Sequence, residues 1–86
     1  VGRSEIDVIA RRGTLLVFCE VRARRRSDFV SPLATIDARK IARIRAAAQR
    51  WLLGRADRGV AIRFDAAGVS FEDDARAEIE YVPGAF

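Results

Sequence analysis

The segment SEIDVIARRGTLLVFCEVRARRR, residues 4–26, decides the fold of this chain, because its pattern is typical of two strands joined by a tight turn. Residues 5–10 and 14–23 are rich in Val, Ile, Leu and Phe, the residues that favour strands. Residues 11–13, Arg-Arg-Gly, predict the turn, since glycine is free to take a positive φ there.

Three carboxylates, Glu5, Asp7 and Glu20, interrupt these apolar strands. Side chains alternate between the two faces of a strand, so the turn decides whether the carboxylates share a face. If Arg11 pairs with Thr14, Glu5 lies opposite Glu20. Asp7 is then diagonal to Glu20 on the same face, roughly 7–8 Å away. A turn one residue longer or shorter would put Asp7 and Glu20 on opposite faces.

Carboxylates on one face repel one another, so they must be solvated, paired with arginine, or bound to a cation. A set of oxygen ligands selects a hard ion, and Mg²⁺ or Mn²⁺ completed by water and a substrate phosphate fits best. The alternative is an exposed sheet face on which Glu20 pairs with an arginine. Spacing alone leaves both hypotheses open.

A helix is expected after the loop SDFVSP (residues 27–32), from roughly Thr35 or Asp37 to Leu53, with Gly54 as a left-handed stop. At about 100° per residue, an apolar stripe faces the sheet. It comprises Ile41, Ile44, Ala48, Trp51 and Leu52. The opposite side carries Arg39, Arg43 and Arg50, free for solvent or phosphate.

Two further strands are expected, over residues 60–71 and 77–86. Gly68 interrupts the first and predicts a bulge or a hairpin turn, and Pro83 places the second at an edge. The order β-β-α-β-β predicts an α/β fold, a mixed sheet of about four strands with one main helix packed on it. A right-handed crossover makes the second and third strands parallel.

The composition indicates one folded domain, residues 1–86, and no apolar run approaches a membrane span. The net charge is +4, with +7 in residues 1–50 and −3 in residues 51–86, which favours a polyanionic partner for the first half. The chain has no histidine, which excludes His-based triads and His metal sites. The lone Cys19 is expected to pack in the core, and a reducing cytoplasm fits it.

Five motifs, in this order, resemble the YraN family of uncharacterised bacterial proteins. They are SEIDVIA, VFCEVRARR, VSPLATIDARK, RFDAAGVSF and PGAF, and together they cover nearly the whole chain. The EID and EVR elements, with thirteen residues from Asp7 to Glu20, also resemble the PD-(D/E)XK nuclease signature.

The resemblance implies a restriction-endonuclease-like fold, similar to archaeal Holliday junction resolvases. It implies Asp7 and Glu20 as metal ligands, joined by the backbone carbonyl of Val21, with Glu5 as a possible extra acid. Arg22 falls on the motif's lysine, and because arginine keeps its proton it can only orient and stabilise negative charge. Related nucleases begin with a helix and a strand that this chain does not include, so a complete site is expected to need that segment or a partner chain.

The basic residues near the proposed metal are expected to hold phosphates without reading sequence. On the second strand they are Arg24, Arg25 and Arg26, and on the helix Arg39, Lys40 and Arg43. A solvated basic surface is the alternative. Lys40 matches a lysine of the family pattern, which sets it above its neighbours.

Three functional hypotheses follow. The first is a Mg²⁺- or Mn²⁺-dependent nuclease that acts on the phosphodiester backbone of structured DNA, with Asp7, Glu20 and Arg22 as its catalytic residues. The second is a nuclease-fold module that binds nucleic acid without turnover. The third is a protein-interaction module, dimeric through a sheet edge.

Overall fold

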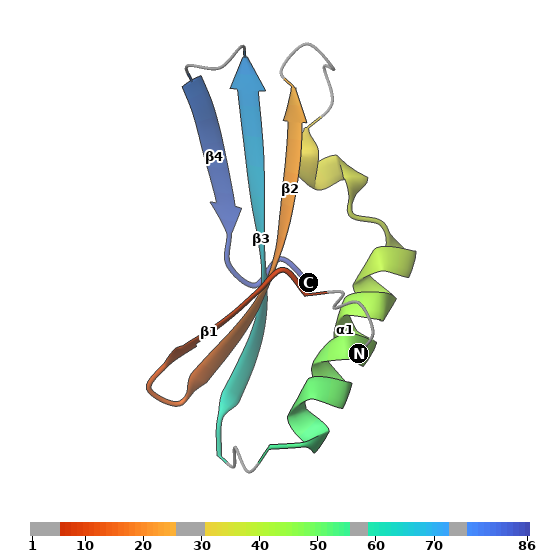
Figure 1. Cartoon of the computed structure of the whole chain (residues 1–86), viewed down its shortest axis with the longest axis vertical. Coiled ribbons are helices and arrows are strands. Elements are labelled where there is room, and N and C mark those ends of the chain that lie inside the picture. Colours follow the sequence, from red (N-terminus) through yellow and green to blue (C-terminus); the bar gives the residue numbers. More distant parts are fainter. Residues whose placement is uncertain (1–5, 26–30, 56–58, 73–75) are drawn as a thin grey trace.

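The computed structural model describes residues 6–25, 31–55, 59–72 and 76–86. They form a mixed four-stranded sheet in the order β1-β2-β3-β4, with one main helix across one face (Figure 1). The α/β prediction is confirmed. The elements are β1 Val8–Arg12, β2 Leu15–Arg25, the 3-10 helix η2 Pro32–Thr35, α1 Ala38–Leu53, β3 Ala61–Glu72 and β4 Arg76–Val82. Within the described residues, no helix has the length and apolar character needed to cross a membrane.

The hairpin between β1 and β2 turns through two residues, Gly13 and Thr14, since Arg12 pairs with Leu15. Gly13 has a φ of 59°, the left-handed value that makes glycine suitable there. The pairing of Arg11 with Thr14 that was considered from the sequence is shifted by two residues, because Arg11 pairs with Leu16. A shift of two keeps every side chain on its predicted face, since strands alternate with a period of two.

The α1 helix connects β2 to β3, and the two strands pair in parallel as predicted. Asp37 caps the helix, accepting a hydrogen bond of 2.8 Å from the backbone N–H of Lys40. Thr35 instead ends η2, where its hydroxyl donates to the carbonyl of Pro32. The loop predicted up to Pro32 thus continues into a short helix that begins at this proline. At the far end, Gly54 has a φ of −88°, so the predicted left-handed stop is wrong.

Gly68 lies inside a continuous β3, so the predicted bulge or hairpin turn is also wrong. The reason for a glycine here is space. A Cβ on Gly68 would lie 3.0 Å from Cγ of Leu33 and 3.3 Å from Cβ of Pro32. Because Gly68 has no side chain, η2 can lie directly on the sheet, next to the N-terminal end of α1.

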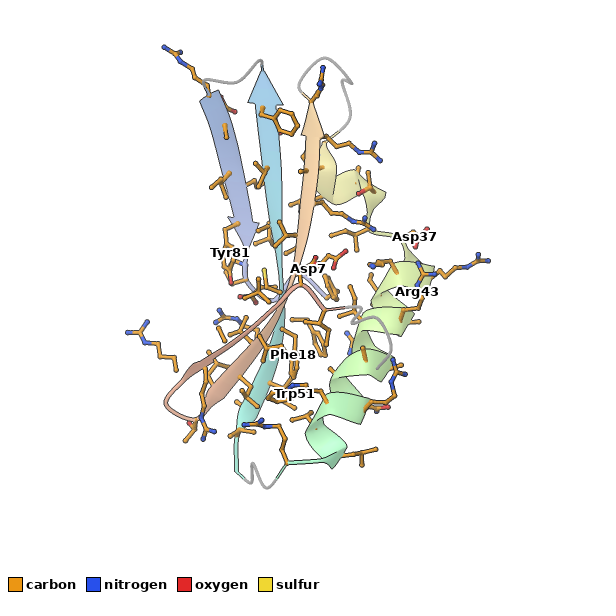
Figure 2. All side chains as sticks on the ribbon, viewed as in Figure 1. Asp7, Phe18, Asp37, Arg43, Trp51 and Tyr81 are labelled. Atoms are coloured by element: carbon orange, nitrogen blue, oxygen red, sulfur yellow. The ribbon has the colours of Figure 1, made fainter. Side chains whose placement is uncertain are left out.

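The core lies between the sheet and α1, around the fully buried Phe18 (Figure 2). Phe64 stacks on its ring at 5.6 Å, and Trp51 meets it edge-on at 5.7 Å. The predicted helix stripe is confirmed in its centre, where Ile44 and Ala48 are buried. Trp51 is only half-buried, as are Ile41 and Leu52, while the three arginines of the opposite side, Arg39, Arg43 and Arg50, are exposed as predicted.

The other face of the sheet is also rich in apolar side chains, and no described element covers it (Figure 1). Val21, Ile79 and Tyr81 are exposed there. Cys19 is buried in this face, which agrees with the packing role predicted for it, and burial raises the pKa of its thiol.

One polar cluster lies on that face, centred on the fully buried Asp65 of β3. The Nε and Nη2 atoms of Arg63 each donate to it at 2.8 Å. The hydroxyl of Tyr81 and the backbone N–H of Gly84 donate as well. Asp65 therefore ties the chain after β4 to the centre of the sheet.

We predict that Asp65→Asn lowers the free energy of unfolding at pH 7 by about 2 kcal/mol. The bonds from Arg63, first among several, hold the pKa of Asp65 at about 2, below its ordinary 3.8. A depressed pKa stabilises the fold above pH 3.8 and loses this effect as the pH falls through about 2. Urea unfolding at pH 7 and between pH 4 and 2 measures the difference, which should shrink in acid.

The exposed Glu80 of β4 supplies the control, since Glu80→Gln should leave stability within about 0.5 kcal/mol of the parent. Equal stability of the parent and Asp65→Asn at pH 7 would contradict this role for Asp65.

Candidate functional site

Glu20 is a charged side chain in the interior of β2, and only 3% of its side chain is exposed. It points to the face that α1 covers, as Phe18 does two residues earlier. Its neighbour in β3 is Ala66, whose small side chain leaves room beside the carboxylate. A buried carboxylate is costly unless other groups pair with it, so the atoms around Glu20 define the site.

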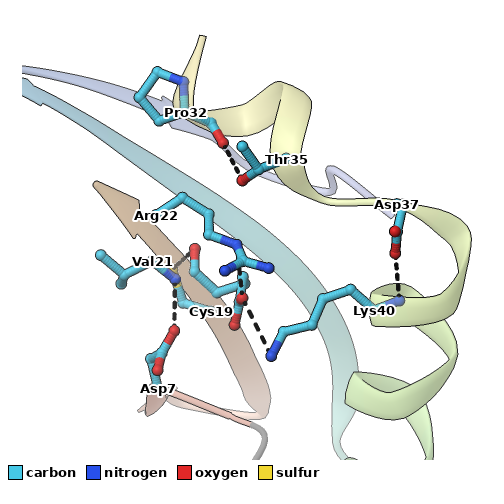
Figure 3. Close-up of polar contacts among 9 residues, drawn as sticks. Asp7, Cys19, Val21, Arg22, Pro32, Thr35, Asp37 and Lys40 are labelled. Atoms are coloured by element: carbon cyan, nitrogen blue, oxygen red, sulfur yellow. Dashed lines mark hydrogen bonds and ion pairs between the residues drawn. The ribbon is translucent and has the colours of Figure 1, made fainter. Parts of the chain in front are cut away.

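Asp7 lies directly before β1, and its Oδ2 accepts a hydrogen bond of 2.9 Å from the backbone N–H of Val21 (Figure 3). The Asp7 side chain thus accepts a hydrogen bond from a backbone N–H of β2 just beyond Cys19, the last residue of β2 that pairs with β1. Continuing the observed register by one step places Asp7 across from Glu20, the place predicted for Glu5. Glu5 lies outside the described residues.

The two carboxylates are close enough to interact, and this contact changes the proton affinity of Glu20. Burial raises the pKa of Glu20, and a hydrogen bond with Asp7 raises it further when one proton lies between the two groups. Lys40 and Arg22 act in the opposite direction, but the pKa stays above its ordinary 4.5. The predicted proximity of Asp7 and Glu20 on one face is therefore present.

Two cations face the same oxygen of Glu20 from different elements. Nε of Arg22 lies 3.3 Å from Oε2, and Nζ of Lys40 lies 3.7 Å from it. Figure 3 shows Lys40 reaching from the first turn of α1 towards β2. The alternative of a Glu20–arginine pair is thus found, but on a buried part of the sheet rather than an exposed one.

The pairing of Glu20 is incomplete. Its Oε1 is buried and has no hydrogen-bond partner among the described residues. The Nε of Arg22 is in the same state, because its N–H is near Oε2 without a hydrogen-bonding alignment. Buried polar atoms in folded proteins nearly always have partners, so this unpaired acceptor and donor are exceptional.

The donor set fits a hard divalent ion. Mg²⁺ is commonly held by one or two carboxylates plus water and substrate phosphate, and Asp7 and Glu20 supply two carboxylates with one buried oxygen unpaired. Within the described ranges, no group of three or more His, Cys, Asp or Glu side chains gathers. The roles of the Val21 carbonyl and of Glu5 stay predictions.

The remaining predicted residues are spread around this site. Arg24 is exposed on the face of Glu20, whereas Arg25 is exposed on the opposite face. On α1, Arg39 and Arg43 are exposed near the helix start. Arg26 lies outside the described residues.

Lys40 lies beside the proposed metal ligand, with only 17% of its side chain exposed and its ammonium directed at Glu20. Its predicted contact with phosphate stays a prediction. The sequence places Lys40 three residues after the capping Asp37, yet how the helix lies on the sheet decides which residue it reaches. Asp65 was missed altogether, although an acid at the centre of the apolar RFD strand was a visible signal.

Comparisons with known proteins agree with the motifs. A sequence model of UPF0102, described as an uncharacterised protein family, matches residues 1–69. A UPF0102 protein of Sorangium cellulosum is 47% identical over 91 residues, which cover 100% of this chain and 62% of that protein. One from Parafrankia sp. is 43% identical over 82 residues, or 95% of this chain and 70% of that protein. The chain thus spans 62–70% of the length of these relatives.

We predict that Glu20→Gln raises the thermal midpoint at pH 7 in a metal-free buffer. The raised pKa means that the folded state favours the neutral form, so ionised Glu20 lowers stability above its folded pKa and protonation restores it. A glutamine amide can donate to Asp7 while its oxygen faces Arg22 and Lys40, as a protonated Glu20 would. Calorimetry of both proteins at pH 7 and pH 4.5 measures the effect.

The stabilisation should diminish at the lower pH, because Glu20 of the parent then takes up its proton. A lower midpoint for Glu20→Gln at pH 7 would show instead that the two ion pairs outweigh burial.

Proposed function

Because this chain belongs to the UPF0102 family of uncharacterised proteins, also called YraN, we propose its function from the site itself: a divalent-metal-dependent nuclease acting on the backbone of structured DNA. The family membership predicted from the motifs is confirmed. The proposal includes a restriction-endonuclease-like fold, which the strand order and the single crossover helix support. Since the chain spans 62–70% of its relatives, the activity is proposed for the full-length protein.

The unpaired atoms at Glu20 and Arg22 carry the proposal. A buried acceptor, Oε1 of Glu20, and a buried donor, Nε of Arg22, lie in one site without hydrogen-bond partners among the described residues. A divalent ion would satisfy the acceptor, and a phosphate oxygen would satisfy the donor. The carboxylates would bind the metal ion, and the neighbouring cations would bind the phosphodiester.

Each residue has a limited set of chemical roles in such a reaction. Asp7 and Glu20 would hold the ion, which would lower the pKa of an attacking water and neutralise charge on the phosphate. Arg22 donates hydrogen bonds to phosphate oxygens and stabilises the negative charge that develops on them. Because arginine cannot accept a proton and the chain has no histidine, the acceptor would be solvent, Glu5 or the substrate phosphate.

The arrangement of basic side chains supports a nucleic-acid substrate. Arg24 extends the site along β2, and Arg39 and Arg43 are exposed on the first turns of α1. Phosphate contacts position a nucleic acid without reading its bases, so a backbone-directed enzyme fits. The basic first half of the sequence provides the matching charge.

A module that binds nucleic acid without turnover is a second candidate. One observation favours it: Arg22 stands where the nuclease signature has lysine, and it pairs with Glu20. An arginine there serves phosphate binding as well as it serves catalysis. Metal binding separates the two, since a binding module needs no ion.

We predict that the full-length protein cleaves branched or flapped DNA with Mg²⁺ or Mn²⁺. Asp7→Asn and Glu20→Gln should each reduce the cleavage rate by about a hundredfold or more, because a metal ion stabilises the transition state by several kcal/mol. Both variants should also lose Mn²⁺ affinity in calorimetric titration. Glu80→Gln, on the exposed edge strand, is the matched control and should behave like the parent.

Mn²⁺ binding that survives in Asp7→Asn and Glu20→Gln would refute the metal site. DNA binding without cleavage of any substrate and without Mn²⁺ binding would instead establish the second candidate.

We also predict that Arg24→Gln weakens DNA binding and lowers the slope of log affinity against log salt by about one unit. Arg25→Gln should change both much less, because Arg25 is the adjacent residue on the opposite face of β2. Filter binding with Ca²⁺ between low and moderate salt measures both slopes. Equal behaviour of the two variants would show that the face of Glu20 does not contact the nucleic acid.

A further inference from the structure

Lys40 lies in an unusual place for a phosphate-binding lysine, because its ammonium faces Glu20 rather than solvent. Nζ lies 3.7 Å from Oε2, and the side chain is 17% exposed. We propose that Lys40 is a positioning residue that holds Glu20 in the metal-free protein, gives up this oxygen when a divalent ion binds, and then faces the substrate phosphate. This inference rests on the proposed function.

The backbone of Lys40 is fixed while its side chain can move. Its N–H is bound by the capping Asp37, which anchors the first turn of α1 (Figure 3). Beyond that anchor, the ammonium sits on a flexible stem of four carbons. The ammonium of Lys40 can therefore turn from Glu20 to another negative group without any shift of the helix. Arg22, in contrast, is a residue of the same strand as Glu20.

Electrostatics predict whether Lys40 raises or lowers the affinity for metal and for substrate. An ammonium and a divalent cation that approach the same carboxylate repel one another, so Lys40 should lower metal affinity when no nucleic acid is present. Once a phosphate is in the site, the displaced ammonium has a negative partner and strengthens substrate binding. Lys40 thus acts in opposite directions on metal and on substrate, which a purely structural residue would not do.

The experiment uses the full-length protein and two titrations. Calorimetry with Mn²⁺ alone measures metal affinity, and filter binding of branched DNA with Ca²⁺ measures substrate affinity. Lys40→Met should bind Mn²⁺ roughly three- to tenfold more tightly than the parent, the range expected for removing one partly screened charge, and should bind DNA more weakly. Lys40→Arg, which keeps the charge, should stay near the parent in the Mn²⁺ titration.

Arg50→Met is the control, because Arg50 is an exposed arginine in the last turn of the same helix. It should leave Mn²⁺ affinity unchanged. Circular dichroism and the thermal midpoint confirm that each variant is folded, and Lys40→Gln replaces Lys40→Met if the apolar side chain lowers the midpoint.

The outcomes separate this inference from the proposed function. If the parent binds Mn²⁺ and Asp7→Asn does not, yet folded Lys40→Met or Lys40→Gln binds Mn²⁺ no more tightly than the parent, the inference is overturned and the metal site stands. If the parent does not bind Mn²⁺ at all, both are overturned. Tighter Mn²⁺ binding with unchanged DNA binding would overturn the second half of the inference, the contact of Lys40 with phosphate.

Discussion

The buried carboxylate of Glu20 is the constraint on which the arrangement of this site depends. A charge in the interior of a strand must be matched, and Arg22 on β2 and Lys40 in the first turn of α1 bring the opposite charges. Ala66 on β3 leaves room for the carboxylate, and Asp7, before β1, adds a second carboxylate that raises the pKa of Glu20. The crossover of α1 from β2 to the parallel β3 is what places Lys40 above the sheet. The same connection that builds the core therefore also assembles the site.

The two buried carboxylates on adjacent strands, Asp65 on β3 and Glu20 on β2, have very different surroundings. Asp65 receives two bonds from Arg63 and one each from Tyr81 and Gly84, and its pKa falls to about 2. Glu20 has two cations near one oxygen, no hydrogen-bond partner for the other among the described residues, and a pKa that burial and then Asp7 raise. The first is what a structural carboxylate requires. The second leaves a buried acceptor without a partner among the described residues, and this is the observation on which the proposed metal site rests.

The sequence predicts the faces of this fold better than its contacts. The hairpin register differs by two residues from the one considered from the sequence, yet Asp7 and Glu20 still share one face, because side-chain alternation has a period of two. The contact of Lys40 with Glu20 could not be predicted in the same way, since it joins a helix to a strand across twenty positions and depends on how the two pack. Gly68 was misjudged for a related reason, because its cause is the approach of η2.

In the proposed nuclease, Arg22 would stand in place of the signature's lysine, and this would change how charge is distributed in the site. A lysine at this position could lose a proton and help to activate water, which an arginine cannot do. Here, two charges face Glu20, one from Arg22 on β2 and one from Lys40 on α1, which is the charge proposed to move. An arginine held beside Glu20 keeps its proton at any physiological pH, so in the proposed reaction it would act on the phosphate and not on the water. In that reaction any proton transfer would rely on groups other than Arg22, and the chain has no histidine to supply it.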